Sequence, residues 1–278
     1  MVLRSNLFLF SSPGLSSSLF LSSNLFLFSS PGLFSSLLLP VVVCDLKNPL
    51  AVRRKVSLSS AIPDRKIKIE EITGERIDDL STINDFSSTE VVPVIISDSL
   101  PTFPISVIVD ARMQKKPMDT KIDDADLVVA LGPGFFAGKD CHVVVETMRG
   151  PNMGKTIWDG CAEEDTGIPG EVGGLTGERL LRSPSNGEIC WIKEIGDLVE
   201  KGEAIGSVGG DDVVARATGV IRGMISEGTL LEVGMKIGDI DPRGAKVDVN
   251  KVSDKALAVG NGVTGAVVEW LGKSKSNL

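Results

Sequence analysis

The sequence has no tyrosine, one histidine and four cysteines. The histidine count and the cysteine spacing each exclude a class of site. A single imidazole, that of His142, excludes a multi-histidine metal centre. The cysteines form no CxxC pair, so we expect no zinc ribbon or redox dithiol, and the thiols are expected to be reduced in an intracellular compartment. The formal net charge of −8 lacks the surplus of lysine and arginine that attracts nucleic acids and anionic membranes, and we expect neither as a partner.

Charge is almost absent from the first 44 residues, where Arg4 is the only charged side chain. The same stretch contains NLFLFSSPGL twice, at residues 6–15 and 24–33. Its apolar runs are broken by serine or Pro-Gly and fall far short of the roughly 18 residues that a membrane span needs. Residues 1–40 are therefore predicted to be a low-complexity leader, either an organellar transit peptide or the product of a mispredicted start. The protein is expected to be cytoplasmic, or organellar if the transit peptide is genuine.

Short runs of apolar residues after the leader predict buried β-strands. These runs cover residues 41–43, 91–96, 105–109, 127–131 and 142–145. Charged, helix-compatible stretches at 67–80 and 118–126 separate several of them. Runs without alternation are typical of strands that are covered on both faces, as in parallel sheets with helices between the strands. Residues 41–181 are therefore predicted to form an α/β region.

Glycines after residue 181 show an internal duplication with an offset of 32 residues. The matched glycines are Gly187, Gly196, Gly202 and Gly206 in the first half and Gly219, Gly228, Gly234 and Gly238 in the second. Two such halves resemble a biotinyl/lipoyl-like barrel-sandwich hybrid. We predict this duplicated domain for residues 182–245, and residues 246–278 are predicted to form a separate C-terminal segment. The loop VGGDDV (208–213) that joins the halves has no lysine to carry a swinging arm, so a structural or docking barrel is expected.

Two motifs invite a ligand-binding interpretation. The string DLVVALGPGFFAG (126–138) is a strand followed by a glycine turn, which is either an anion cradle or a plain tight turn. The string GNGVTG (260–265) satisfies GxGxxG, but only 13 residues follow it, too few for a dinucleotide-binding unit. Adjacent positions on a strand face opposite ways, so Cys141 and His142 are not expected to form a catalytic dyad.

Seven strings, spread in order along the chain, resemble one family. They are NPLAVRRKV (48–56), VDARM (109–113), ALGPGFFAGKDCHVVVETMRG (130–150), TGIPGEVGG (166–174), ERLLRSP (178–184), KIGDIDPRG (236–244) and SDKALAVGNGV (253–263). This pattern resembles the YqeB-type family, the accessory proteins of selenium-dependent molybdenum hydroxylase systems. The resemblance covers about residues 41–268. Family members begin with a strand and a GGGDLA-like glycine loop, and the Ser/Leu/Phe repeat stands in their place here.

The resemblance implies a fold class of α/β, with an incomplete Rossmann-like parallel sheet region followed by the small all-β barrel-sandwich hybrid. It implies an accessory or maturation protein for a molybdenum hydroxylase partner, binding a molybdenum-cofactor-type pterin or a nucleotide. The alternative is a noncatalytic interaction protein whose barrel docks on a partner enzyme. A self-sufficient enzyme is least favoured, because the sequence offers neither a nucleophile–base pair nor a metal set. The matching cofactor-binding positions are Asp110, Arg112, Gly132, Gly134, His142, Glu146 and Arg149. The two glycines would approach an anionic ligand, and the two arginines would pair with its charge.

Overall fold

The computed structural model describes residues 7–9, 41–86, 91–97, 99, 105–113 and 119–276. Apart from strand β1 (Leu7–Leu9), the predicted leader lies outside the described residues. The chain divides into two compact units. Unit 1 consists of Met1–Lys47, Leu58–Thr166 and Val252–Leu278, and unit 2 of Asn48–Ser57 and Gly167–Lys251.

The first sheet of unit 1 has five strands in the order β1-β2-β5-β4-β3. Its further strands are β2 (Val42–Asp45), β3 (Lys66–Ile69), β4 (Ile72–Ile77) and β5 (Val91–Ile96). Strands β2, β5 and β4 are parallel, and β1 and β3 pair antiparallel to them at the two edges. The short helix α2 (Ala61–Asp64) and the 3-10 turns η2 (Leu58–Ser60) and η3 (Leu80–Phe86) complete this part.

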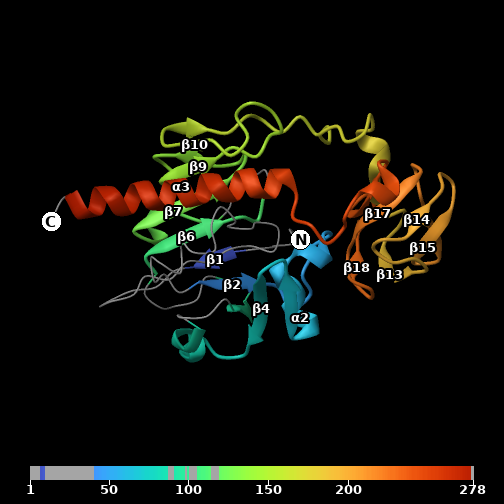
Figure 1. Cartoon of the computed structure of the whole chain (residues 1–278), viewed down its shortest axis with the longest axis horizontal. Helices are drawn as coiled ribbons and strands as arrows, with labels where there is room; N and C mark the ends of the chain where they lie inside the picture. The colour runs from blue at the N-terminus through green and yellow to red at the C-terminus, as the bar shows by residue number, and fades with distance from the viewer. Residues whose placement is uncertain are drawn as a thin grey trace. The chain divides into compact units, whose positions relative to one another are not determined.

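The second sheet of unit 1, in the order β10-β9-β7-β6, positions most of the predicted site. Strands β6 (Val107–Asp110), β7 (Leu127–Leu131) and β9 (Val143–Val145) are parallel and buried throughout, and β10 (Thr156–Ile157) is antiparallel. The turn η4 (Ile122–Asp124) precedes β7, and β8 (Phe136–Ala137) pairs with β11 (Gly160–Cys161). Helix α3 (Asp254–Ser276) lies along this sheet and packs against β7, β9 and β10 (Figure 1).

Unit 2 contains two antiparallel sheets of four strands, ordered β12-β19-β17-β14 and β16-β15-β13-β18. The strands are β12 (Leu180–Arg182), β13 (Gly187–Trp191), β14 (Leu198–Val199), β15 (Ala204–Val208), β16 (Asp211–Val214), β17 (Gly219–Met224), β18 (Leu230–Leu231) and β19 (Lys236–Asp241). The turns η1 (Arg54–Val56), η5 (Gly177–Arg179) and η6 (Gly244–Lys246) flank them. Strands β13, β14 and β15 begin 32 residues before β17, β18 and β19.

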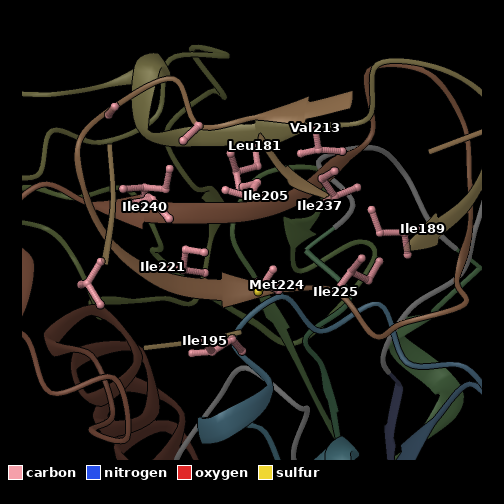
Figure 2. Close-up of a cluster of buried hydrophobic side chains, with 14 of the residues drawn as sticks. Leu181, Ile189, Ile195, Ile205, Val213, Ile221, Met224, Ile225, Ile237 and Ile240 are labelled. Carbon is pink, nitrogen blue, oxygen red and sulfur yellow. The ribbon is translucent and has the colours of Figure 1, made fainter. Parts of the chain in front are cut away.

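The core of unit 2 is built from aliphatic side chains of both sheets (Figure 2). Ile189 and Ile221 are matched by the 32-residue offset, as are Ile205 and Ile237, and all four are fully buried. Glycines of the same repeat let strands approach closely: a Cβ at Gly206 would lie 2.7 Å from the Cys190 carbonyl oxygen. The repeated sequence therefore supplies both the buried positions and the close contacts of this core.

The expected fold class, α/β with an incomplete Rossmann-like region and a biotinyl/lipoyl-like barrel-sandwich hybrid, is wrong. The regular elements of the described residues are mostly β-strands with few helices, and they show no Rossmann-like alternation of helices with the parallel strands of unit 1. Residues 67–80, predicted to be helix-compatible, form the hairpin β3–β4 instead. Its first strand, KIKI (66–69), alternates polar and apolar side chains with the period of a strand, and this signal outweighs the charge content.

The second part of that expectation fails because unit 2 is organised as two half-barrels of four strands. Strands β12 and β16 lie outside the repeat, and each adds a strand at one edge of a sheet. The glycine spacing predicts where tight turns fall, but it does not determine how strands group into sheets. Among the described residues, no helix combines the length and apolar character needed to cross a membrane.

Candidate functional site

Six of the seven predicted site residues lie at one edge of the second sheet of unit 1. Because β6, β7 and β9 are parallel, the residues that follow them meet at the same edge, which we call the carboxyl edge. Asp110 ends β6 opposite Ala130 of β7, and Leu131 of β7 is opposite Val145 of β9. The carboxyl edge thus carries Asp110, Arg112, Gly132, Gly134, Glu146 and Arg149. Only His142 lies elsewhere.

Asp110 and Arg112 form a buried ion pair at the carboxyl edge. Arg112 Nη2 donates to Asp110 Oδ2 at 2.6 Å, and Arg112 Nε lies 3.1 Å from both carboxylate oxygens. The same guanidinium donates to Asp119 Oδ1 and Thr120 Oγ1, both at 2.6 Å. Burial lowers the pKa of Arg112, but the hydrogen bonds to the two aspartates outweigh it and raise that pKa overall. Arg112 is therefore occupied within the protein and orders the edge.

The glycine turn after β7 is a tight turn whose first amide, that of Gly132, is already used within the sheet. Gly132 has a φ of +74° and Gly134 a φ of +107°, a region that glycine adopts without strain. The Gly132 amide donates to the Val145 carbonyl oxygen at 2.9 Å, so it is used within the sheet. A Cβ at Gly132 would lie 2.5 Å from Thr147 Oγ1. The turn continues into β8 with no helix N-terminus, and of the two readings the plain tight turn fits these contacts.

Glu146 follows β9 and organises the loops around it. Its side chain is buried, with Oε1 accepting from the Met148 amide at 2.6 Å and Oε2 accepting from the Glu163 amide at 2.7 Å. Its own amide donates to the Lys155 carbonyl oxygen. A carboxylate that accepts two backbone N–H groups is well compensated for its burial. This residue holds loops in place and leaves no oxygen unpaired.

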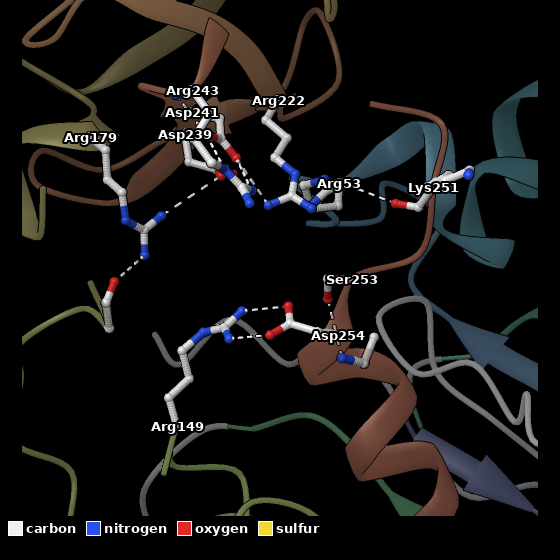
Figure 3. Close-up of polar contacts among 12 residues, drawn as sticks. Arg53, Arg149, Arg179, Arg222, Asp239, Asp241, Arg243, Lys251, Ser253 and Asp254 are labelled. Carbon is white, nitrogen blue, oxygen red and sulfur yellow. Dashed lines mark hydrogen bonds and ion pairs between the residues drawn. The ribbon is translucent and has the colours of Figure 1, made fainter. Parts of the chain in front are cut away.

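Arg149 is the predicted cation that reaches solvent at the carboxyl edge. Its side chain is 33% exposed and forms a two-point ion pair with Asp254, the first residue of α3 (Figure 3). The Nη1–Oδ2 and Nη2–Oδ1 distances are 2.5 and 2.9 Å. The Asp254 side chain is 67% exposed, so this pair contributes little to stability and can exchange. Arg149 thus has the geometry to bind a carboxylate or a phosphate.

His142 precedes β9 and therefore lies at the opposite end of the strands. The Val128 amide donates to His142 Nδ1 at 3.0 Å, so this nitrogen acts as an acceptor. Burial lowers the pKa of His142, although Asp123 and Asp126 oppose the shift. Neighbouring Cys141 is fully buried, and burial raises the pKa of its thiol to about 12. His142 is a hydrogen-bonded structural residue that is separate from the carboxyl edge.

A second group of charged residues, in unit 2, was only partly anticipated. The sequence predicts a polar cluster of Asp239, Asp241, Arg243, Asp254 and Lys255, but the last two belong to unit 1. It gives no sign that Arg179 and Arg222 join the first three. Arg222 and Arg243 both donate to Asp241, and Arg179 lies 3.8 Å from Asp239. One feature of the sequence could have indicated this group. Three of the seven strings that carry the family resemblance contribute charged residues to it, namely 48–56, 178–184 and 236–244.

Among the described residues, no group of three or more His, Cys, Asp and Glu side chains is arranged to hold a metal ion. All four cysteines are free, with Cys44 and Cys141 buried and Cys161 and Cys190 exposed. No nucleophile paired with a base is found among the six residues of the carboxyl edge, and of its two arginines Arg149 is the one that reaches solvent.

Comparison with known proteins gives one relative with extensive similarity. The chain is 37% identical over 231 residues to "Uncharacterized protein YqeB" of Escherichia coli K12, which is 82% of this chain and 43% of that protein. The chain thus spans less than half the length of this relative. No family model matches the chain. A crystal structure of an aspartoacylase family protein from Mesorhizobium loti is similar over 23% of this chain and 22% of that chain, with 20% identity and a TM-score of 0.21.

Proposed function

We propose that this chain, whose similarity to YqeB supports the YqeB-type family, is an accessory protein that serves a molybdenum hydroxylase. In this proposal it binds a phosphate-bearing ligand of the pterin or nucleotide type at the carboxyl edge and catalyses no reaction alone. The role in a molybdenum system follows from the family resemblance of the seven strings. The ligand chemistry rests on one observation, the solvent-reaching guanidinium of Arg149.

Arg149 supports this proposal because its present partner can be replaced. The Asp254 carboxylate occupies both terminal nitrogens of the guanidinium in the geometry that two phosphate oxygens would adopt. Arg112 cannot take this role, because Asp110, Asp119 and Thr120 use its donors. Arg112 is a positioning residue that fixes the loop after β6. The ligand's phosphate would exchange with Asp254 at Arg149.

The test measures binding of GMP to the full chain, with guanosine as the matched ligand without phosphate. Guanine shares the amino-oxo-pyrimidine ring of pterins, so the two probes isolate the contribution of the phosphate. GMP is expected to raise the thermal midpoint with a saturable dependence on concentration, and guanosine is not. Arg149→Ala should weaken GMP binding at least tenfold. Asp254→Ala should strengthen it, because the competing carboxylate is gone.

Arg65→Ala is the matched control, since Arg65 forms an exposed ion pair with Asp78 in the same unit. This variant should bind GMP as the unmodified chain does. The proposal fails if GMP and guanosine give the same response, or if Arg149→Ala binds GMP with unchanged affinity. Opposite effects of the Arg149 and Asp254 variants separate ligand exchange from a general loss of structure.

A second candidate function, docking of unit 2 on a partner enzyme, is favoured by exposed leucines on two edge strands. Leu198 of β14 is 58% exposed and Leu230 of β18 is 75% exposed, and they are matched by the 32-residue offset. Contiguous exposed apolar surface marks sites where proteins bind one another, and these two leucines are the candidate apolar contacts of unit 2. If Leu198→Ser with Leu230→Ser abolishes binding to a purified molybdenum hydroxylase while Arg149→Ala does not, docking is the function.

A further inference from the structure

Unit 2 contains a cluster of buried and half-buried charged side chains in which arginines outnumber aspartates. We call it the arginine cluster, and its members are Arg53, Arg179, Arg222, Arg243, Asp239 and Asp241. Figure 3 shows their side chains gathered around the two carboxylates of β19. The arginines come from η5, β17, the residue before η6 and the separate segment Asn48–Ser57.

Backbone contacts bring the segment Asn48–Ser57 onto β17. The Met224 amide donates to the Val52 carbonyl oxygen at 2.8 Å, and Arg54 Nε donates to the Met224 carbonyl oxygen at 2.7 Å. Gly223 makes this approach possible, because a Cβ there would lie 2.8 Å from Val52 Cγ1 and 2.8 Å from Asp239 Oδ1. The absence of a side chain at residue 223 therefore lets Arg53 reach the cluster. Arg53 precedes the other three arginines by 126 or more residues in the sequence.

The two aspartates do not neutralise the four arginines. Asp241 is almost fully buried and accepts from Arg243 at 2.7 and 2.9 Å and from Arg222 at 3.2 Å. Asp239 is also buried, and its ion pair with Arg179 is long, at 3.8 Å. Four positive and two negative side chains leave a surplus of two positive charges. Arg53, Arg179 and Arg222, which carry part of this surplus, are only partly exposed, so water screens their charges incompletely and a bound anion would stabilise them.

Unused hydrogen-bond donors accompany this surplus of charge. The Nε atoms of Arg53, Arg179 and Arg222 are buried and have no hydrogen-bond partner among the described residues. Buried polar groups in native proteins nearly always have partners, so three such donors in one cluster are unusual. Burial and the nearby charge of Arg222 lower the pKa of Arg53 to about 10, although Asp239 and Asp241 oppose the shift. Both observations indicate that the cluster lacks a negative group.

We propose that the arginine cluster is an anion-binding site of unit 2, distinct from the carboxyl edge, which takes the phosphoryl group of a small molecule. Arg243 brings the cluster to the surface, because its side chain is 51% exposed while it pairs with buried Asp241. A phosphoryl group carries oxygens in several directions and accepts from more than one guanidinium at a time. Arginines supply planar forks that match this geometry better than the point charge of lysine does.

The experiment measures binding of inorganic phosphate to the full chain by calorimetry and by the thermal midpoint, at constant ionic strength set with chloride. Hydrogen exchange of the β17 and β19 amides reports where phosphate binds. Phosphate is expected to bind saturably and to slow exchange in these two strands. Arg222→Gln and Arg243→Gln are each expected to weaken binding at least tenfold, and Arg222→Lys to weaken it as well despite its retained charge.

Arg65→Gln and Arg149→Ala are the controls, because they remove an arginine from unit 1 and should leave protection of β17 and β19 unchanged. Arg243 is half exposed, so its variant is expected to fold even if Arg222→Gln does not. The proposal is overturned if phosphate gives no saturable response beyond that of chloride, or if it protects only the carboxyl edge. It is equally overturned if a folded Arg243→Gln variant keeps full phosphate affinity.

Discussion

Removing the Arg112 side chain should destabilise unit 1 far more than removing an exposed arginine. The buried Asp110 carboxylate depends on Arg112 through contacts of 2.6 to 3.1 Å. Loss of one partner from a buried ion pair costs about 3–5 kcal/mol. After Arg112→Met, Asp110 still accepts from Thr120 Oγ1 and from the amide of residue 112. Because these two donors remain, we expect the free energy of unfolding to fall by about 3 kcal/mol, the lower end of that range.

Equilibrium urea unfolding measures this loss, and circular dichroism and tryptophan fluorescence together test whether the transition is cooperative. Arg65→Met is the matched control, because Arg65 pairs with Asp78 on the surface, with side chains that are 65% and 64% exposed. An exposed pair contributes about 0–1 kcal/mol. The reasoning is refuted if Arg112→Met unfolds at the same urea concentration as Arg65→Met.

Two further predictions concern positions outside the carboxyl edge. Because burial lowers the pKa of His142, folding favours its neutral form. This stabilisation is fully present above the pKa of the unfolded state, near 6.5, and is lost as the pH falls below it through the lowered pKa of the folded state. His142→Asn should flatten the decline of the urea midpoint between pH 7.5 and 5, and equal slopes would contradict this. Gly262→Ala should lower stability by about 1–3 kcal/mol, since a Cβ there collides with the Gly154 carbonyl oxygen. Gly265→Ala, in open space on the same helix, should raise stability by up to about 1 kcal/mol, and a loss as large as that of Gly262→Ala would argue against a steric cause.

The sequence predicted where many strands lie but not what connects them. Uninterrupted apolar runs correspond to β2, β5, β6, β7 and β9, because a buried strand needs apolar side chains on both faces. The expectation of intervening helices rested on charge content, which strands of a solvent-facing hairpin share with helices. Period-two alternation in residues 66–69 was the better signal and predicts β3.

The candidate site shows the same limit of local patterns. Six residues gather at the carboxyl edge because each ends or follows a parallel strand, and that can be inferred from the strands alone. The partner of Arg149 could not be inferred, because Asp254 lies 105 residues further along the chain. The arginine cluster likewise depends on Arg53 reaching β17, which a missing side chain at Gly223 permits. Contacts between residues more than a hundred positions apart are determined by tertiary packing, and the periodicity of the sequence does not predict them.

Because each unit is built from separate segments of the chain, neither unit can fold completely as soon as one stretch has been synthesised. The chain passes between the units four times, after residues 47, 57, 166 and 251. Unit 1 therefore cannot be completed until α3 is synthesised, which happens after residues 167–251 of unit 2, although the described strands of unit 1 are synthesised before those residues. Unit 2 in turn needs Asn48–Ser57, which emerges more than a hundred residues earlier. Neither unit corresponds to a continuous stretch of nascent chain, so an excised fragment of residues 167–251 would lack Val52 and Arg53, and with them one wall of the arginine cluster.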